Sequence, residues 1–419
     1  MSFDLLSTAI NFGKTYYHPK FVTNAIDEVA SKAYRTVAKD NSGTGKECNF
    51  LCDVDGGVPA GSATLSQAND TATNSTATIG AQFSVPWTKD YLPFAVDGLT
   101  LSNTKSDKGA FVNALKYNMD RALKYAAHRA SISFQGEGWG ELSDRAGIVY
   151  SSGATFKFAD PAHIYRIMKG MPLQFCQTLD SGALRSSTVS TVTDIDYSGN
   201  VVTLDANPPS VANADTVVIA GDRQNVSSPV RLRPIGYPGW IPDRSTGSVP
   251  ASLVTLGSVS RASNSLLYGH YVDGTGQSIL DALMQAVQTV ASIGNADDVV
   301  IAVSPANYTE AAKSINGDRR FLDVKGQGVA GFRAIQVLSD GGEGKMFADK
   351  YCSSDRAFVW QPKAFTEISC NGPSPRLDTD DGRQFVRMSD EDAIIGRFKS
   401  YLAMVCLNPN ACAFVKLPN

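Results

Sequence analysis

The chain has 419 residues, of which 43% are hydrophobic and 19% charged, and its net charge is −3. These values are typical of a folded protein of two or three domains, and they exclude a protein that binds nucleic acid through a strongly basic face. No run of about 18 apolar residues occurs, so we expect no membrane-spanning helix.

The N-terminal residues 1–45 are predicted to form an arm. Apolar residues recur at helical spacing over residues 21–38, which predicts a helix. Glycine, serine and asparagine over residues 41–45 indicate a loop after it. The first residues lack the basic and apolar regions of a signal peptide, and the odd, scattered set of seven cysteines favours reduced thiols in a cytoplasmic product.

Residues 46–106 are predicted to be an extended loop. Residues 56–80 are small and polar, whereas 83–87 and 91–96 carry the aromatic and β-branched residues of strands, with prolines that suit an edge. Ordering so long a segment requires a surface to bury against. We therefore expect residues 53–106 to be stabilised by another copy of the chain, which favours an assembly protein over a catalyst.

The side chains expected at contacts between copies are few. Trp87 and Phe94 are placed there because their segment has no evident core of its own, and aromatic residues dominate binding energy. Tyr91, the lysines of the loop and two polar residues of the following helix complete the set. It consists of Trp87, Lys89, Tyr91, Phe94, Lys105, His128 and Arg129.

Residues 107–131 form the clearest predicted helix. Met119, Ala122, Ala126 and Ala130 lie on one apolar stripe, and charged residues take the other side. About 25 residues at 1.5 Å each give a rod of nearly 40 Å. The glycines at 136–140 end it. We assign residues 107–170 to this helix and a peripheral domain.

The rest of the chain alternates in character. Residues 171–240 are predicted to be a β-rich insertion that resembles a small barrel, with a hairpin over 189–204 and a strand at 216–220. Residues 241–375 are predicted to be an α/β domain with helices at 278–293 and 307–315 and a buried strand at 297–305. Residues 376–419 are mostly strand-like.

Motifs for catalysis or cofactor binding fail on context. Gly326, Gly328 and Gly331 match a dinucleotide fingerprint, but a strand follows where the motif needs a helix. Residues 341–345 are predicted to be a turn. The carboxylates around Asp378 and Asp390 do not match a calcium loop, so a hydrolase built on residues 378–381 is disfavoured. We predict no enzyme, no cofactor, and no catalytic or metal residues.

The order of these segments resembles the major capsid proteins of tailed bacteriophages, which have the Hong Kong 97-type shell fold. Residues 257–269, followed by 274–279, resemble the entry to the axial domain of such proteins, and residues 298–307 resemble their buried strand and the helix after it. Residues 387–417, with Asn408 and Pro409 between two strand-like stretches, are similar to their C-terminal end.

The resemblance implies an α+β shell fold with an N-terminal arm, an extended β-loop, a long spine helix, peripheral and axial domains, and here an inserted β-barrel-like domain. Residues 241–375 would be the axial domain, and residues 376–419 would be C-terminal strands that return to the peripheral domain. It implies a structural subunit that assembles into hexamers and pentamers of an icosahedral head in the host cytoplasm and remains in the virion. Scaffolding, portal and possible decoration proteins, together with packaged double-stranded DNA contacted non-specifically, would be its partners. An encapsulin-type nanocompartment shell and a tail, baseplate or adhesin protein are the alternatives.

Overall fold

The computed structural model describes most of the chain. The described residues are 36–55, 79–98, 108–179, 183–224, 230–262, 264–294, 296, 298–318, 335–339, 342–372, 374–378, 385–388 and 391–418. Most of the predicted arm helix, Lys105, the hairpin tip at 56–78 and the glycine motif at 326–331 lie outside them.

A six-stranded sheet, which we call the peripheral sheet, is built around one long strand. This strand pairs with β4 along one side and with β18, β19 and β20 along the other, and β18 pairs in parallel with β1. The strands are β1 (Ala38–Gly43), β4 (Thr88–Asp97), β18 (Phe365–Cys370), β19 (Arg376–Leu377), β20 (Val386–Arg387) and the long strand β21 (Ala393–Cys406).

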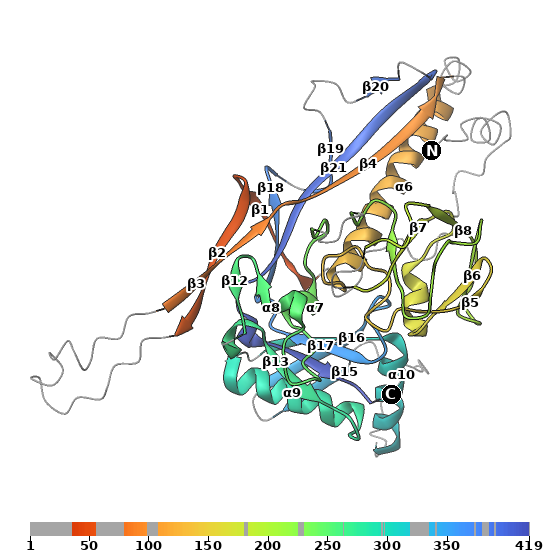
Figure 1. Cartoon of the computed structure of the whole chain (residues 1–419). Coiled ribbons are helices and arrows are strands. Elements are labelled where there is room, and N and C mark those ends of the chain that lie inside the picture. The colour runs from red at the N-terminus through yellow and green to blue at the C-terminus, as the bar shows by residue number, and fades with distance from the viewer. Residues whose placement is uncertain are drawn as a thin grey trace, which may run out of the picture.

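The spine helix α6, Lys108–Phe134, runs beside this sheet (Figure 1). Its 27 residues correspond to about 40 Å, so the predicted long helix is confirmed. Met119, Ala122, Leu123 and Ala126 pack against Phe94 and its neighbours on the sheet. The predicted apolar stripe therefore covers the sheet where it can be described.

Strand β1 corrects the prediction of a loop for residues 41–43, while residues 44 and 45 lie outside any strand. Thr36 is helical, and β1 begins at Ala38. Its backbone pairs with β18 from Ala38, opposite Thr366, to Gly43, opposite Cys370. This pairing with a distant strand outweighs the turn preference of the local sequence.

A two-stranded hairpin projects from the body of the molecule (Figure 1). It consists of β2 (Glu47–Asp55) and β3 (Ile79–Pro86), paired from Glu47 and Pro86 to Asp55 and Ile79. Its base is anchored in its own chain. Phe50 stacks on Phe83 at 5.2 Å, and Phe83, which is fully buried, meets Trp240 at 5.5 Å.

The expectation that residues 53–106 lack a surface in their own fold is wrong for β4. All ten of its residues pair with β21. Leu92, Phe94 and Val96 are buried, while Lys89, Tyr91 and Pro93 are exposed on the opposite face. Because β21 lies near the other end of the chain, local sequence carries no sign of this partner.

The β-rich unit is larger than predicted. Its sheet has the order β10-β7-β8-β9-β6-β5, so the predicted boundary at residue 171 divides it. The predicted hairpin is confirmed by β8 and β9 and the predicted strand by β10. The elements are β5 (Ile148–Ser152), β6 (Thr155–Phe158), η1 (Pro161–Arg166), β7 (Pro172–Cys176), β8 (Ser190–Asp196), β9 (Val201–Leu204) and β10 (Thr216–Ile219).

The two ends of this sheet approach each other, as the predicted barrel-like shape requires. Ile148, at the start of β5, donates to Asp215 and accepts from Ala214, both just before β10. The side chains inside form a hydrophobic cluster separate from the main one, including Phe156, Phe175 and Val202. Ile132 of the spine helix and Tyr351 belong to the same cluster, so the unit shares its hydrophobic centre with the rest of the subunit.

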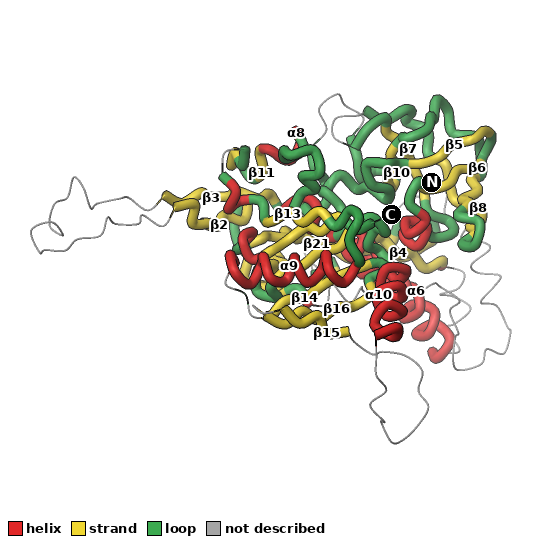
Figure 2. The backbone as a smooth tube through the Cα atoms, turned by 90° about the horizontal axis from the view of Figure 1, so that it is seen from below, coloured by secondary structure: helices red, strands yellow, loops and turns green. Residues whose placement is uncertain are grey.

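A further six-stranded sheet, which we call the axial sheet, has the order β13-β22-β17-β14-β16-β15, and α9 crosses its strands in Figure 2. The predicted helices and buried strand are confirmed. The elements are β13 (His270–Asp273), α9 (Ile279–Gly294), β14 (Asp298–Val303), α10 (Pro305–Asp318), β15 (Ile335–Ser339), β16 (Gly342–Ala348), β17 (Arg356–Trp360) and β22 (Cys412–Lys416).

Short elements join the sheets. They are α7 (Tyr237–Trp240), α8 (Ala251–Val254), β11 (Thr255–Leu256), β12 (Val259–Ser260), η2 (Ser265–Leu267) and η3 (Pro409–Ala411). The last of these joins β21 to β22 at the Asn408–Pro409 pair.

Two predicted boundaries near the C-terminus need correction. β18 was assigned to the axial domain, but it lies in the peripheral sheet, and β22 was assigned to the peripheral strands, but it lies in the axial sheet. The predicted turn at 341–345 is a strand from Gly342 onward. Gly344 suits this strand because an added Cβ would lie 2.7 Å from Ile301 and 3.0 Å from Val287.

In the portion of the chain that is described, no helix is both long and apolar enough to cross a membrane.

Replacing Phe83 with alanine is expected to lower the free energy of unfolding by about 3–5 kcal/mol, because it empties the aromatic cluster under the hairpin. Urea unfolding of the unassembled chain measures this loss. Gln82→Ala, at an exposed position of the same strand, is the control and should change stability by less than about 0.5 kcal/mol. Equal effects of the two substitutions would contradict the anchoring of the hairpin base.

Candidate functional site

The predicted interface residues divide into two groups. Lys89 and Tyr91 are exposed on the open face of β4. The Tyr91 hydroxyl lies 2.9 Å from the Tyr401 hydroxyl, which holds the ring on that face. These two residues are available to a neighbouring molecule, and their role at an interface stays a prediction.

The aromatic residues Trp87 and Phe94 are instead held by their own chain. Phe94 is 6% exposed and its ring lies 5.2 Å from that of Phe398. Trp87 packs against the main core, and its indole Nε1 donates to the Gly45 carbonyl at 3.1 Å. The reason given for placing them at an interface, the lack of a core, is therefore wrong.

His128 is also internal, which corrects its predicted surface or interface position. It is 2% exposed. Its Nδ1 lies 2.7 Å from the Tyr351 hydroxyl and its Nε2 lies 3.3 Å from the Arg166 carbonyl oxygen. The ring therefore connects the spine helix to η1 and to the segment before β17.

Arg129, predicted on the outer side of the helix, belongs to a largely buried cluster of four charges, whose side chains are 4% to 19% exposed. We call this cluster, formed by Asp90, Arg129, Asp222 and Arg233, the hub. Arg129 contacts Asp222 at 2.7 Å and Asp90 at 3.3 Å, and Arg233 contacts Asp90 at 3.1 Å and also pairs with Asp222. Each arginine therefore bridges both carboxylates.

The hub joins four segments of the chain. Asp90 comes from β4, Arg129 from α6, Asp222 from the end of the β-rich unit, and Arg233 from the segment that leaves it. That segment also bonds to the loop after α6, where Arg233 N donates to the Gly138 carbonyl. The position of the spine helix is thus fixed against both the sheet and the β-rich unit.

Burial dominates the electrostatics of the hub. It raises the pKa of Asp222 to about 7 against the opposing attraction of Arg129, and nearby Asp90 and Glu141 act in the same direction as burial. Burial also raises the pKa of Asp90, although Arg129 opposes this shift. A carboxyl group at this position therefore takes up a proton near neutral pH.

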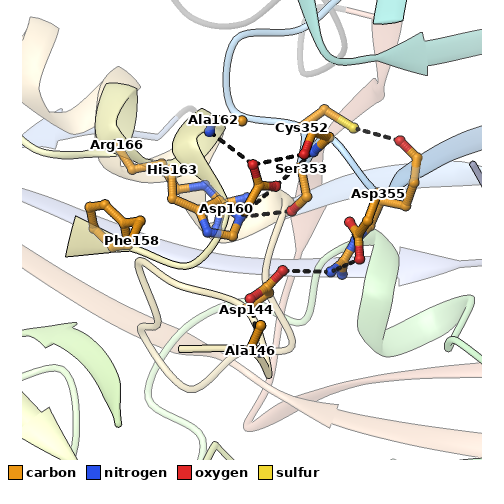
Figure 3. A network of polar contacts seen from close by, with 12 residues as sticks. Asp144, Ala146, Phe158, Asp160, Ala162, His163, Arg166, Cys352, Ser353 and Asp355 are labelled. Atoms are coloured by element: carbon orange, nitrogen blue, oxygen red, sulfur yellow. Dashed lines mark hydrogen bonds and ion pairs between the residues drawn. The ribbon is translucent and has the colours of Figure 1, made fainter. Parts of the chain in front are cut away.

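A second buried network connects the β-rich unit to the axial sheet (Figure 3). Arg356, the first residue of β17, donates to Asp355 at 2.7 Å and to Asp144 at 3.0 Å. Asp160 accepts from the Ser354 backbone at 2.7 Å and from its hydroxyl at 2.8 Å. The network therefore crosses from the loop before β5 and from η1 to the strand entry at β17.

Three members of this network, Asp144, Asp160 and His163, have potential ligand atoms within 4.8 Å of one another. Their chemistry does not fit a metal ion. The Asp144 and Asp160 oxygens already accept from Arg356, Ser354 and backbone amides, and His163 Nε2 lies 2.8 Å from the Ser353 hydroxyl. The nearby guanidinium groups would repel a cation.

The pKa shifts in the network agree with a structural role. Burial lowers the pKa of His163 well below its ordinary value, and the positive charges of Arg166 and Arg356 lower it further. Burial alone would lower the pKa of Arg356, but Asp355 and Asp144 raise it overall. The network therefore holds a neutral imidazole and a permanently charged guanidinium.

Asp90, Asp222, Arg233 and Arg356 were missed by sequence reasoning. One signal was present for Asp90, because it shares the parity of Leu92, Phe94 and Val96 along β4 and must face the helix with them. Arg356 precedes the apolar run of β17, which places a charge at the edge of a buried strand. Neither pattern identifies the partner residues.

Comparison with known proteins identifies this architecture. The chain is similar to the structure of the cyanophage A-1(L) capsid asymmetric unit, with a TM-score of 0.57 and 11% identity over 96% of this chain and 97% of that one. It is also similar to the capsid of an empty GTA particle, with a TM-score of 0.50 and 9% identity over 98% and 96%.

The chain has the fold of a capsid shell protein. The predicted fold class is thereby confirmed. No protein-family model matches the sequence, and no curated protein matches it. Because the sequence identities are only 11% and 9%, the similarity concerns the fold and not individual residues. The hub and the second network are therefore described for this chain alone.

Arg356→Met is expected to lower the free energy of unfolding by about 3–5 kcal/mol, because it leaves the buried Asp144 carboxylate without its counter-charge. Arg387→Met is the matched control. Its ion pair with Asp392 is mostly exposed, with side chains 77% and 66% accessible, and should contribute about 0–1 kcal/mol. Urea unfolding measures the loss of unfolding free energy in both variants. Equal losses would contradict the predicted difference between the two ion pairs.

The pH dependence of stability is expected to change in Asp222→Asn. Because the pKa of Asp222 is raised in the folded chain to about 7, the folded state binds a proton that the unfolded state releases near pH 4. Stability from this group is therefore full below pH 4 and falls as the pH rises to 7, by up to about 1.4 kcal/mol per pH unit. The asparagine variant should lack this component.

Urea midpoints at pH 5, 6, 7 and 8 for both proteins measure the component as a difference. A difference between the two proteins that stays constant across this range would contradict the proton uptake at Asp222.

Proposed function

We propose that this protein is a structural major capsid protein, many copies of which assemble into the icosahedral head shell that encloses a phage genome. The observation that supports this most is the fold, which follows that of capsid proteins over nearly the whole chain. The shape of the molecule adds support, since a globular body carries a hairpin that extends beyond it (Figure 1).

A closed shell requires different surfaces of one chain to meet in neighbouring copies. The hairpin supplies such a surface. Leu51 is 66% exposed on it, and its strands lead to the polar residues 56–78. The open face of β4, with Lys89 and Tyr91, supplies a second surface, and Lys105 is placed with it by sequence alone. Weak contacts suffice because many copies add them together.

Trp87, Phe94, His128 and Arg129 take a different role in this proposal. They hold β4 and the spine helix in place within the subunit, so that the contact surfaces keep their geometry. We infer that the body bound by the hub moves as one unit when the shell changes size, while the hairpin and arm change their angle.

The partners follow from the proposed role. Copies of the chain would form the hexamers and pentamers of the head, together with scaffolding, portal and possible decoration proteins. The net charge of −3 suits a surface that contacts packaged double-stranded DNA without binding it tightly. The protein would be assembled in the host cytoplasm and would then belong to the virion, acting without catalysis, cofactor or membrane attachment.

Shortening the hairpin is expected to separate folding from assembly. Asp55 pairs with Ile79, so an Asn-Gly turn in place of residues 56–78 closes the hairpin directly. The shortened chain should unfold at the same urea concentration as the full chain but should form no closed particles by negative-stain electron microscopy. A variant in which a Gly-Ser segment of the same length replaces residues 56–78 controls for the length of the hairpin.

Particles from the shortened chain would contradict the role of the hairpin tip. A full chain that stays a compact monomer at high concentration, with or without a scaffolding protein, would contradict the capsid function itself.

A further inference from the structure

A groove of about 310 Å³ lies between the spine helix and the peripheral sheet. It exists because the helix presents short side chains there. The helix side of the groove is lined by Ala126, Ala127, Ala130 and Ser133. None of these side chains is long enough to fill the space between the helix and the strands. Thr88 of β4 and Ser400 and Leu402 of β21 line it from the sheet.

The groove is mainly apolar along its walls and ends at the hub. Leu123, Pro234 and Pro375 add to the apolar lining. Asp90, Arg129 and Arg233 of the hub also line it, and there the Asp90 carboxylate already pairs with both guanidinium groups. An occupant that fits would therefore offer apolar side chains to the walls.

The chain itself enters the fold at this groove. Lys39, the second residue of β1, is one of the lining residues. Thr36 is the first described residue, so the 35 residues before it are tethered within a few residues of the groove. A tethered segment binds at a high effective concentration, so that even a weak contact is populated.

We propose that the N-terminal arm of the same chain seats its apolar face in this groove. The sequence supplies the matching chemistry, because Phe21, Val22, Ile26 and Val29 recur at helical spacing and would form one apolar face. This is the docking of an amphipathic helix by a few anchor side chains.

The hairpin tip of a second copy fits the groove less well. Residues 56–78 carry Val58 and Leu65 among mostly small and polar residues, and they would have to arrive from another molecule. The proposed contact lies within one chain and is therefore present before any assembly, so it stands or falls separately from the capsid function.

Cysteine pairs in the unassembled full-length chain test the contact. Ala130→Cys lies in the groove, and it is combined in turn with Ile26→Cys or Val29→Cys in the arm. Mild oxidation should give a disulfide within the monomer, seen as a shifted band on a non-reducing gel, at least tenfold above the yield with Arg121→Cys. Arg121 is on the same helix at an exposed position, and single-cysteine variants control for the native thiols.

Disulfide-linked dimers as the main product would overturn the proposal, because the arm would then belong to a second copy. A yield no higher than that of the Arg121→Cys pairs would also overturn it. Circular dichroism of each variant establishes that it is folded before the yields are compared.

Proteolysis supplies an independent measurement without altering the groove. The double variant Ile26→Asp, Val29→Asp should release the arm and raise the rate of tryptic cleavage after Lys32 and Arg35 at least tenfold, since cleavage follows the open population. Ser31→Asp adds a charge to the polar side of the arm and should leave the rate unchanged. Equal rates in all three proteins would contradict docking.

Discussion

The arrangement of this subunit depends on the hub formed by Asp90, Arg129, Asp222 and Arg233. Four charges largely removed from water are tolerated only if each remains paired in good geometry. Here each arginine meets both carboxylates, so displacing one member weakens the pairing of the others. The spine helix, the strand β4 and the C-terminal end of the β-rich unit are therefore fixed relative to one another at a single point.

The second network gives the same constraint on the opposite side of the β-rich unit. Arg356 ties Asp144 to the axial sheet, and Asp160 binds the backbone just before it. The hydrophobic cluster of the unit also includes Ile132 of the spine helix and Tyr351. The two polar networks and this shared cluster therefore hold the unit against the rest of the subunit.

Sequence reasoning identified elements better than it identified their partners. The spine helix, α9 and the hairpin of β8 and β9 follow from local periodicity and turn residues, which act over a few positions. The pairing of β4 with β21 and of β1 with β18 joins opposite ends of the chain, and so Phe94 was placed at an interface and residues 41–43 in a loop. The hub was missed for the same reason, because Arg129 is read as a surface charge until Asp90 and Asp222 are brought to it.

The strand β4 shows how one segment serves both stability and assembly. Its alternation places Asp90, Leu92, Phe94 and Val96 on the side of the spine helix and Lys89 and Tyr91 on the open side. A one-residue shift in register would exchange the two sets. It would bury Lys89 and expose Leu92, Phe94 and Val96 to solvent. The pairing of all ten residues with β21 and the ion pairs of Asp90 both oppose that shift. The surface offered to a neighbouring copy is therefore set by the same contacts that stabilise the core.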